Sequence, residues 1–160
     1  MLQDALRREP PLVLDAHALT LLAEDGLPLL KSLRHVPILT PHAGEFARLF
    51  KQDASSKVEH TRNAAAEAGA VIVFKGADTV IAAPDGRAAI ARPASPWLAT
   101  AGTGDVLAGI IVAMRARGFE AFDAACAGVW LHSRAAALAG PALIADDLVT
   151  CLPSAIGECL

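Results

Sequence analysis

The chain has 160 residues, 54% of them hydrophobic and 19% charged, which is the size of one domain and too apolar for an intrinsically disordered protein. Its net charge of −3 and scattered basic residues give no electrostatic footprint for nucleic acid, and no uncharged run reaches the roughly 17–25 residues of a membrane span. Neither a nucleic acid nor a membrane is expected as a partner. Three cysteines without CxxC spacing and an N-terminus without an apolar signal core indicate a cytoplasmic protein.

Short apolar runs bounded by turn residues predict the strands of a sheet. Residues 12–14, 37–40 and 71–74 are three such runs, and the last, Val-Ile-Val-Phe, is typical of a central strand buried on both faces. Residues 79–91 contain two more apolar runs around an Asp-Gly pair, which predicts an antiparallel hairpin. We therefore expect about five strands.

Helical patterns fill the segments between and after these strands. They cover residues 17–33 with a break near Gly26, a segment beginning at Pro41, and residues 58–68, 104–117, 121–138 and 146–152. Thr40 is expected to cap the helix that begins at Pro41, and Pro153 to end the last helix. Strands that alternate with helices predict a layered α/β fold. Because the chain opens almost directly on a strand, we expect the sheet to continue into strands that this chain does not contain.

The most informative segment, Gly102-Thr103-Gly104-Asp105, stands at the entrance of an apolar helix. The two glycines let the backbone approach a ligand closely, and the free N–H groups of a first helical turn form an anion site. Phosphate is the expected anion. Asp105 has two interpretations: an aspartate that stabilises the helix start, or a base acting on a group beside the phosphate.

Other polar residues also follow predicted strands, where ligands of open α/β sheets bind. Lys75 and Thr79 could contact a phosphate, or form only a surface turn into the hairpin. His42 could bind a substrate and Glu45 a hydrated Mg²⁺, or Glu45 could be a capping partner beside an exposed His42. Asp15 is a fourth such residue, with a helix N-cap as its alternative. Their shared position predicts one crevice.

Several kinds of site have no support in the sequence. No His, Cys and Asp cluster has metal-ligand spacing, so no metal ligand is predicted, and His132 is expected to be a packed residue inside a helix. GxSxG, GxxxxGK[ST] and strand-GxGxxG-helix patterns are absent, which argues against hydrolase, P-loop and Rossmann proteins.

Four segments together resemble one family. They are VLDAHAL at residues 13–19, LTPHAGEF at 39–46, KGADT at 75–79 and AGTGDVL at 101–107. In this order and spacing they resemble the ADP-dependent NAD(P)H-hydrate dehydratases, the carbohydrate-kinase-like domain of the nicotinamide-nucleotide repair enzymes. The resemblance implies a ribokinase-like three-layer α/β/α sandwich, of which residues 1–160 would be the C-terminal part, without the N-terminal strands.

The resemblance also implies an activity and its residues. Hydrated NADH or NADPH would be dehydrated to the reduced cofactor while ADP is consumed to AMP and phosphate, usually with Mg²⁺. His42 and Asp105 would contact the hydrated nucleotide, with Asp105 as the catalytic base. The implied ADP-binding residues are Lys75, Gly76, Ala77, Asp78, Thr79, Pro96, Trp97, Leu98, Ala99, Thr100, Ala101, Gly102, Thr103 and Gly104. Two positions depart from the family pattern: Ser95 replaces a frequent Asn, and His17 replaces an aspartate and so receives no role.

Two other functions fit the same residues. A ribokinase-like kinase would use the Gly102–Asp105 segment with ATP and Mg²⁺ to phosphorylate a small alcohol. A half-domain without catalysis would bind only an adenine nucleotide. An incomplete sheet exposes a strand edge, so we also expect an oligomer of identical chains.

Overall fold

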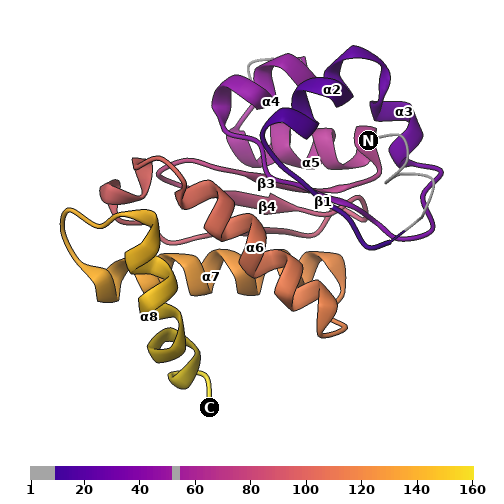
Figure 1. The fold of residues 1–160 in the computed structure, drawn as a ribbon. Helices are drawn as coiled ribbons and strands as arrows, with labels where there is room; N and C mark the ends of the chain where they lie inside the picture. Colours follow the sequence, from indigo (N-terminus) through magenta and orange to yellow (C-terminus); the bar gives the residue numbers. More distant parts are fainter. Residues whose placement is uncertain (1–9, 52–54) are drawn as a thin grey trace.

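The sheet in this computed structural model, which describes residues 10–51 and 55–160, has five strands side by side in sequence order (Figure 1). They are Val13–Leu14 (β1), Ile38–Leu39 (β2), Val71–Phe74 (β3), Val80–Ala82 (β4) and Ala88–Ile90 (β5). β1, β2 and β3 run parallel, whereas β4 is antiparallel to both β3 and β5. The predicted strands and hairpin are confirmed. The carboxyl ends of β1, β2, β3 and β5 consequently meet at one edge of the sheet.

The central strands are buried because both faces of the sheet are covered. Leu39 pairs with Ile72, and both side chains enter the apolar core on one face. Ile38 pairs with Val71, and these side chains enter the core on the opposite face. All four are at most 1% exposed. The continuous apolar runs of the sequence are therefore explained by alternation between two cores.

Two groups of helices form the outer layers on opposite faces of the sheet (Figure 1). The first group contains α2 (His17–Asp25), α3 (Leu27–Leu30), α4 (Ala43–Leu49) and α5 (Lys57–Ala68). The second contains α6 (Thr103–Ala116), α7 (Ala121–Ala139) and α8 (Ala145–Gly157), preceded by the short 3₁₀ turn η1 (Pro96–Ala99). The layered α/β arrangement predicted from the sequence is confirmed.

Two predicted helix boundaries are wrong. α4 begins at Ala43 with His42 as its N-cap, because the His42 side chain, rather than that of Thr40, accepts the N–H groups of the first turn. α8 continues through Pro153 to Gly157. Leu148 before the proline and Ala155 after it are both fully buried. Packing on both sides therefore offsets the backbone hydrogen bond that a proline inside a helix removes.

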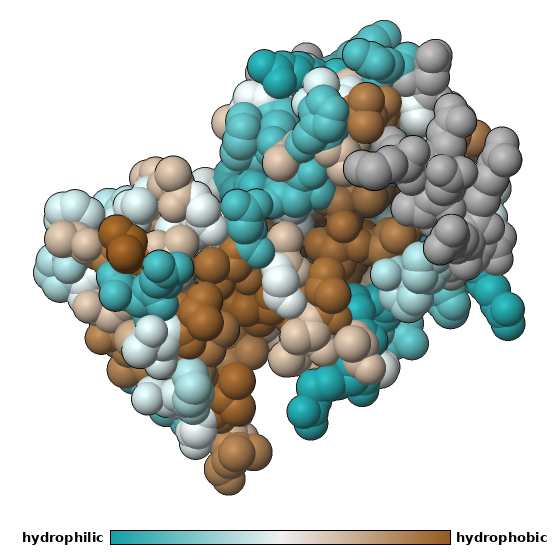
Figure 2. Space-filling model, in the orientation of Figure 1, coloured by the Kyte–Doolittle hydropathy of each residue, from teal (hydrophilic) through white to brown (hydrophobic). Residues whose placement is uncertain are grey.

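Apolar surface gathers over α6 and α8 on the face drawn in Figure 2. There Val106, Ile110, Val149 and Ile156 are among the residues that line a shallow hollow of about 280 Å³. Within the described part of the chain, β1 has one strand neighbour, β2. The expected oligomer stays a prediction. Across residues 10–51 and 55–160, no helix combines the length and apolar character needed to cross a membrane.

Candidate functional site

The carboxyl ends of β1 and β3 bring Asp15 and Lys75 together. The Lys75 Nζ donates a hydrogen bond to Asp15 Oδ1 at 3.0 Å, and the two side chains are only 20% and 13% exposed. The backbone N–H of Lys75 also donates to the carbonyl of Pro41, which joins the end of β3 to the loop after β2. Three of the predicted strand ends therefore meet, as expected from the sequence.

The turn after β1 determines where Asp15 points. Its backbone carbonyl accepts the N–H of Ala18 at 3.1 Å, and Ala16 between them has the positive φ of 49°. No side chain caps α2, whose N-cap residue is Ala16. The N-cap interpretation of Asp15 is therefore wrong: its carboxylate makes no capping bond to α2 and accepts a hydrogen bond from Lys75.

The N-terminus of α6 is built on Gly102 and Thr103. Gly102 has φ 84°, a left-handed conformation that a side chain would strain. The buried Thr103 hydroxyl lies 2.7 Å from the carbonyl of Leu98 and 2.8 Å from that of Thr100. Its hydrogen bonds tie the helix start to η1. The first turn of α6 is consequently held in one place, with its free N–H groups at the helix N-terminus.

Gly104 connects this helix start with the Asp15–Lys75 pair. A Cβ atom at Gly104 would lie 3.5 Å from Lys75 Nζ and 3.8 Å from Asp15 Oδ2. The ion pair therefore lies directly against the first turn of α6, where the absence of a side chain leaves the ammonium group uncovered. Asp15, Lys75 and the start of α6 at residues 102–104 therefore form a single site.

Asp105 is exposed in the first turn of α6 and has no hydrogen bond or ion pair with any described residue. The cap of this helix is Gly102, and no side chain supplies a capping hydrogen bond. Asp105 therefore gains only the favourable field of the helix N-terminus. Its carboxylate is available to a ligand.

His132 supports the same turn from α7. Its Nε2 lies 2.8 Å from the carbonyl oxygen of Thr103, and its side chain is buried, as the sequence predicted. Burial lowers the pKa of His132, and the nearby Lys75 charge lowers this pKa further, against the opposing effect of the bond to Thr103. The neutral ring thus donates its Nε2–H to the carbonyl. Nothing in the sequence pointed to this contact across 29 residues.

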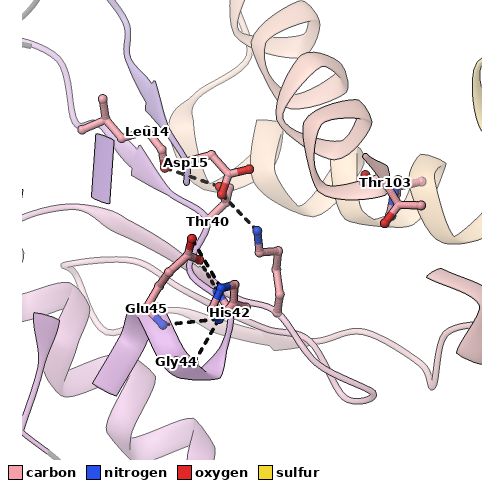
Figure 3. Close-up of polar contacts among 9 residues, drawn as sticks. Leu14, Asp15, Thr40, His42, Gly44, Glu45 and Thr103 are labelled. Carbon is pink, nitrogen blue, oxygen red and sulfur yellow. Dashed lines mark hydrogen bonds and ion pairs between the residues drawn. The ribbon is translucent and has the colours of Figure 1, made fainter. Parts of the chain in front are cut away.

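His42 and Glu45 form the cap of α4. The N–H groups of Gly44 and Glu45 donate to His42 Nδ1 at 3.0 and 3.3 Å, and the N–H of His42 donates to Glu45 Oε2 at 2.8 Å (Figure 3). Glu45 is buried, whereas the His42 side chain is 60% exposed. The capping interpretation of Glu45 is confirmed, with His42 rather than Thr40 as its partner. Because Nδ1 accepts two N–H groups, Nε2 carries the ring proton.

The loop after β3 is stabilised by its own contacts. The Thr79 hydroxyl donates to the carbonyl of Gly76 at 3.1 Å. Lys57 Nζ lies 2.7 Å from the carbonyl oxygen of Asp78 and 2.8 Å from its Oδ1, and it also lies over the Phe74 ring. The bond from Lys57 lowers the pKa of Asp78. Lys57 was missed in the sequence, where it stands as an ordinary helix residue.

A hollow of about 700 Å³ lies beside the remaining predicted positions, between β5 and α7. Its wall includes Ala91, which follows β5, Ser95 next to η1, and Ser133 in α7. Ser133 follows His132, which contacts Thr103. The residue of α7 next to His132 in sequence therefore borders the hollow. Trp97 in η1 is 46% exposed.

The described residues contain no group of three or more His, Cys, Asp or Glu side chains that could hold a metal ion. Glu45 Oε2 accepts the N–H of His42 in the cap of α4, and a contact of Glu45 with hydrated Mg²⁺ stays a prediction. Mg²⁺ in nucleotide sites is commonly bound by phosphates, water and one or two carboxylates. Asp105 offers a single carboxylate, so it could bind Mg²⁺ only together with phosphates and water.

Comparisons with known proteins identify the family of the chain. The family model described as NAD(P)H-hydrate dehydratase matches residues 1–156. An ADP-dependent (S)-NAD(P)H-hydrate dehydratase from Neisseria meningitidis is 42% identical over 134 residues, which cover 80% of this chain and 45% of that protein. A bifunctional NAD(P)H-hydrate repair enzyme from Moorella thermoacetica is 41% identical over 157 residues, covering 92% of this chain and 29% of the relative. The chain thus spans less than half the length of these relatives.

Solved structures give the same result for the fold. The ADP/ATP-dependent NAD(P)H-hydrate dehydratase of Bacillus subtilis, co-crystallised with ATP and Mg²⁺, superposes with a TM-score of 0.80 at 32% identity, covering 98% of this chain and 57% of that one. A ribokinase-like superfamily protein from Enterococcus faecalis superposes with a TM-score of 0.84 at 26% identity, with the same coverage. The chain has a ribokinase-like α/β fold and belongs to the NAD(P)H-hydrate dehydratase family.

Proposed function

We propose that residues 1–160 form the C-terminal, nucleotide-binding part of an ADP-dependent NAD(P)H-hydrate dehydratase domain. In this reaction ADP and hydrated NADH or NADPH give AMP, phosphate and the reduced cofactor. One observation carries the proposal: Lys75 and Asp15 lie against Gly104 in the first turn of α6. A cation beside a helix N-terminus that a glycine leaves open is suited to a diphosphate group.

The phosphate groups of ADP are assigned to the N-terminus of α6. The N–H groups of Gly102 and Gly104 and the positive end of the dipole of this 14-residue helix favour an anion there, while the Thr103 N–H donates to the carbonyl of Thr100. Lys75 adds a positive charge on the side of the sheet. These groups would stabilise the negative charge of a phosphoryl group during its transfer.

Asp105 is the proposed base, because it is the exposed carboxylate beside that phosphate site. It takes the proton of the substrate hydroxyl while the hydroxyl oxygen attacks the terminal phosphorus of ADP and AMP leaves. The phosphate ester is a better leaving group than hydroxide. Its C–O bond then breaks, a proton leaves the neighbouring ring carbon, and the double bond of the reduced nicotinamide forms.

The remaining proposed contacts follow from position. The hollow between β5 and α7 has room for an adenine ring and borders Ser95, next to residues 96–104. Residues 75–79 would line the phosphates from the other side. His42, whose ring is exposed and whose Nε2 lies 3.5 Å from Glu45 Oε1, would bind the hydrated nucleotide. Mg²⁺, carried by the nucleotide phosphates, supplies charge neutralisation when bound.

The test is recovery of the near-ultraviolet absorbance of reduced nicotinamide from hydrated NADH or NADPH, with ADP, with ATP and without nucleotide. ADP-dependent recovery by this chain supports the dehydratase. If the chain instead phosphorylates a small alcohol with ATP and restores no absorbance, it is a kinase and the dehydratase proposal is wrong. If ADP raises the unfolding temperature of the chain but no turnover is seen, the chain is a half-domain that binds the nucleotide without catalysis. A chain that neither turns over nor is stabilised by ADP contradicts the proposed site altogether.

A further inference from the structure

We propose that Asp15 is a positioning residue: its carboxylate holds the ammonium group of Lys75 beneath Gly104, so that the remaining N–H donors of Lys75 face the phosphates of a bound nucleoside diphosphate. This role rests on the proposed function, because it needs the nucleotide site at the start of α6. Asp15 itself contacts Lys75 and not the nucleotide.

The geometry around Lys75 supports this role. A lysine side chain is a flexible four-carbon stem with a point charge, so a free ammonium group samples many positions. Here Asp15 accepts one of its three N–H groups at 3.0 Å. Both side chains are mostly buried, which limits their movement. Two donors of Lys75 remain, next to the uncovered backbone of Gly104.

The neighbouring lysine is not available for the same task. Lys57 Nζ is bound to the carbonyl and the carboxylate of Asp78 on the outer side of the loop after β3. Lys57 Nζ also lies over the Phe74 ring, 4.5 Å from its centroid, whereas Lys75 Nζ lies against Gly104. Among the described lysines of this region, Lys75 is therefore the one directed at the start of α6.

The backbone before α2 is shaped for this contact. Ala16 has φ 49° and ψ −118°, a conformation that residues with a side chain rarely adopt. Because of this turn, Asp15 leaves β1 directed at Lys75 instead of capping α2. Strained backbone of this kind is found preferentially at functional sites.

A simple charge argument predicts the opposite effect on binding. A carboxylate close to a phosphate repels it, so Asp15→Asn should tighten ADP binding if charge alone mattered. If Asp15 positions Lys75, the same substitution weakens ADP binding even though a negative charge is lost. The sign of the change therefore separates the two accounts.

The experiment is a double-mutant cycle on ADP affinity, measured by calorimetry. We expect Asp15→Asn to raise the Kd for ADP about tenfold in the unmodified chain. In a Lys75→Met background the same substitution should change the Kd less than about twofold, because the group through which Asp15 acts is gone. Asp85→Asn removes one partner of the exposed Asp85–Arg87 pair in the hairpin turn and serves as the matched control without effect.

Asp15→Glu keeps the charge and displaces the carboxylate by one methylene group. If Asp15 positions Lys75, Asp15→Glu should lose part of the ADP affinity that Asp15→Asn loses. The Asp15→Glu variant also provides the test if Asp15→Asn does not fold. Tighter binding in Asp15→Asn, unchanged affinity in both variants, or an equal loss in the Lys75→Met background overturns the role of Asp15. An unmodified chain that binds no ADP overturns the nucleotide site of the proposed function and this role with it.

Discussion

The Nε2 of His132 lies 2.8 Å from the carbonyl oxygen of Thr103, so α7 holds the first turn of α6 through one buried hydrogen bond. Thr103 in turn binds η1 through its hydroxyl. The start of α6 is thus attached on both sides. This matters because the proposed phosphate site consists of the backbone of that turn, whose position has to be fixed before a ligand arrives.

The first prediction concerns stability against pH. Burial holds the pKa of His132 below its ordinary value of 6.5, which is the value it regains in the unfolded chain. Below about pH 6.5 the unfolded chain therefore binds more protons at this residue than the folded chain, and the free energy of unfolding falls as the pH falls. The contribution of neutral His132 is complete above that pH. Urea unfolding between pH 7 and pH 5 should show this loss.

His132→Gln is the matching variant, because its amide N–H can still donate to the Thr103 carbonyl but does not titrate in this range. We expect its free energy of unfolding to vary less between pH 7 and pH 5 than that of the unmodified chain. His35→Gln, at an exposed position, should leave the pH dependence as it is. Equal pH dependence in the unmodified chain and in His132→Gln contradicts the prediction.

The second prediction separates stability from binding at Gly104. In Gly104→Ala the added methyl group lies at ordinary contact distance from Lys75 Nζ, 3.5 Å, so the fold accepts it. Alanine is also the better helix former, and stability should stay level or rise by up to about 1 kcal/mol. The methyl group covers the ammonium group, however, and the Kd for ADP should rise about tenfold.

Gly109→Ala is the control in the same helix, because a Cβ atom there meets nothing within 4 Å. It should stabilise the chain by about 0.5–1 kcal/mol and leave ADP binding unchanged. Thermal unfolding and calorimetry measure both quantities. If Gly104→Ala binds ADP as tightly as Gly109→Ala does, the phosphates do not approach Lys75 at this turn.

Much of the fold was predictable because its signals are local. The run at residues 71–74 is apolar without alternation, which required burial on both faces, and the Asp-Gly pair specified the hairpin turn. The position of the site at one edge of the sheet was predictable because the carboxyl ends of parallel strands lie at the same edge. These parts depended on periodicity and turn chemistry, which do not need knowledge of distant contacts.

The errors arose where tertiary contacts decide. Pro153 would end an isolated helix, but α8 is held by packing on both sides of it. The Asp15–Lys75 pair and the His132–Thr103 bond join residues 60 and 29 positions apart, which no local pattern encodes. The cap of α4 is a different case: Thr40 before Pro41 has the local pattern of an N-cap, but the His42 side chain makes the capping hydrogen bonds.

The third prediction divides the two tasks of His42. His42→Ala removes the acceptor for the N–H groups of Gly44 and Glu45 and should lower the free energy of unfolding by about 1 kcal/mol. His42→Asn should keep most of this stability, because asparagine is a good N-cap, while it loses the imidazole donor. If His42 also binds the hydrated nucleotide, both variants raise its KM. A normal KM in His42→Asn limits His42 to capping α4.

The fourth prediction tests the proposed base. The Asp105 side chain is exposed and makes no hydrogen bond or ion pair with another described residue. Asp105→Asn should therefore change the free energy of unfolding by no more than about 0.5 kcal/mol. Removing a negative charge beside the phosphates should leave ADP binding as tight as before or make it tighter. The dehydration rate should nevertheless fall about 10²- to 10⁴-fold, because the hydroxyl proton has lost its acceptor.

Asp146→Asn is the control for that rate, since Asp146 is likewise an exposed aspartate in the first turn of a helix, α8. It should retain the full dehydration rate, measured in a single turnover with saturating ADP so that product release does not mask the chemical step. Suppose Asp105→Asn keeps most of the rate while its ADP affinity is unchanged. The proton then goes elsewhere, and the carboxylate in the first turn of α6 contributes only its interaction with the helix dipole.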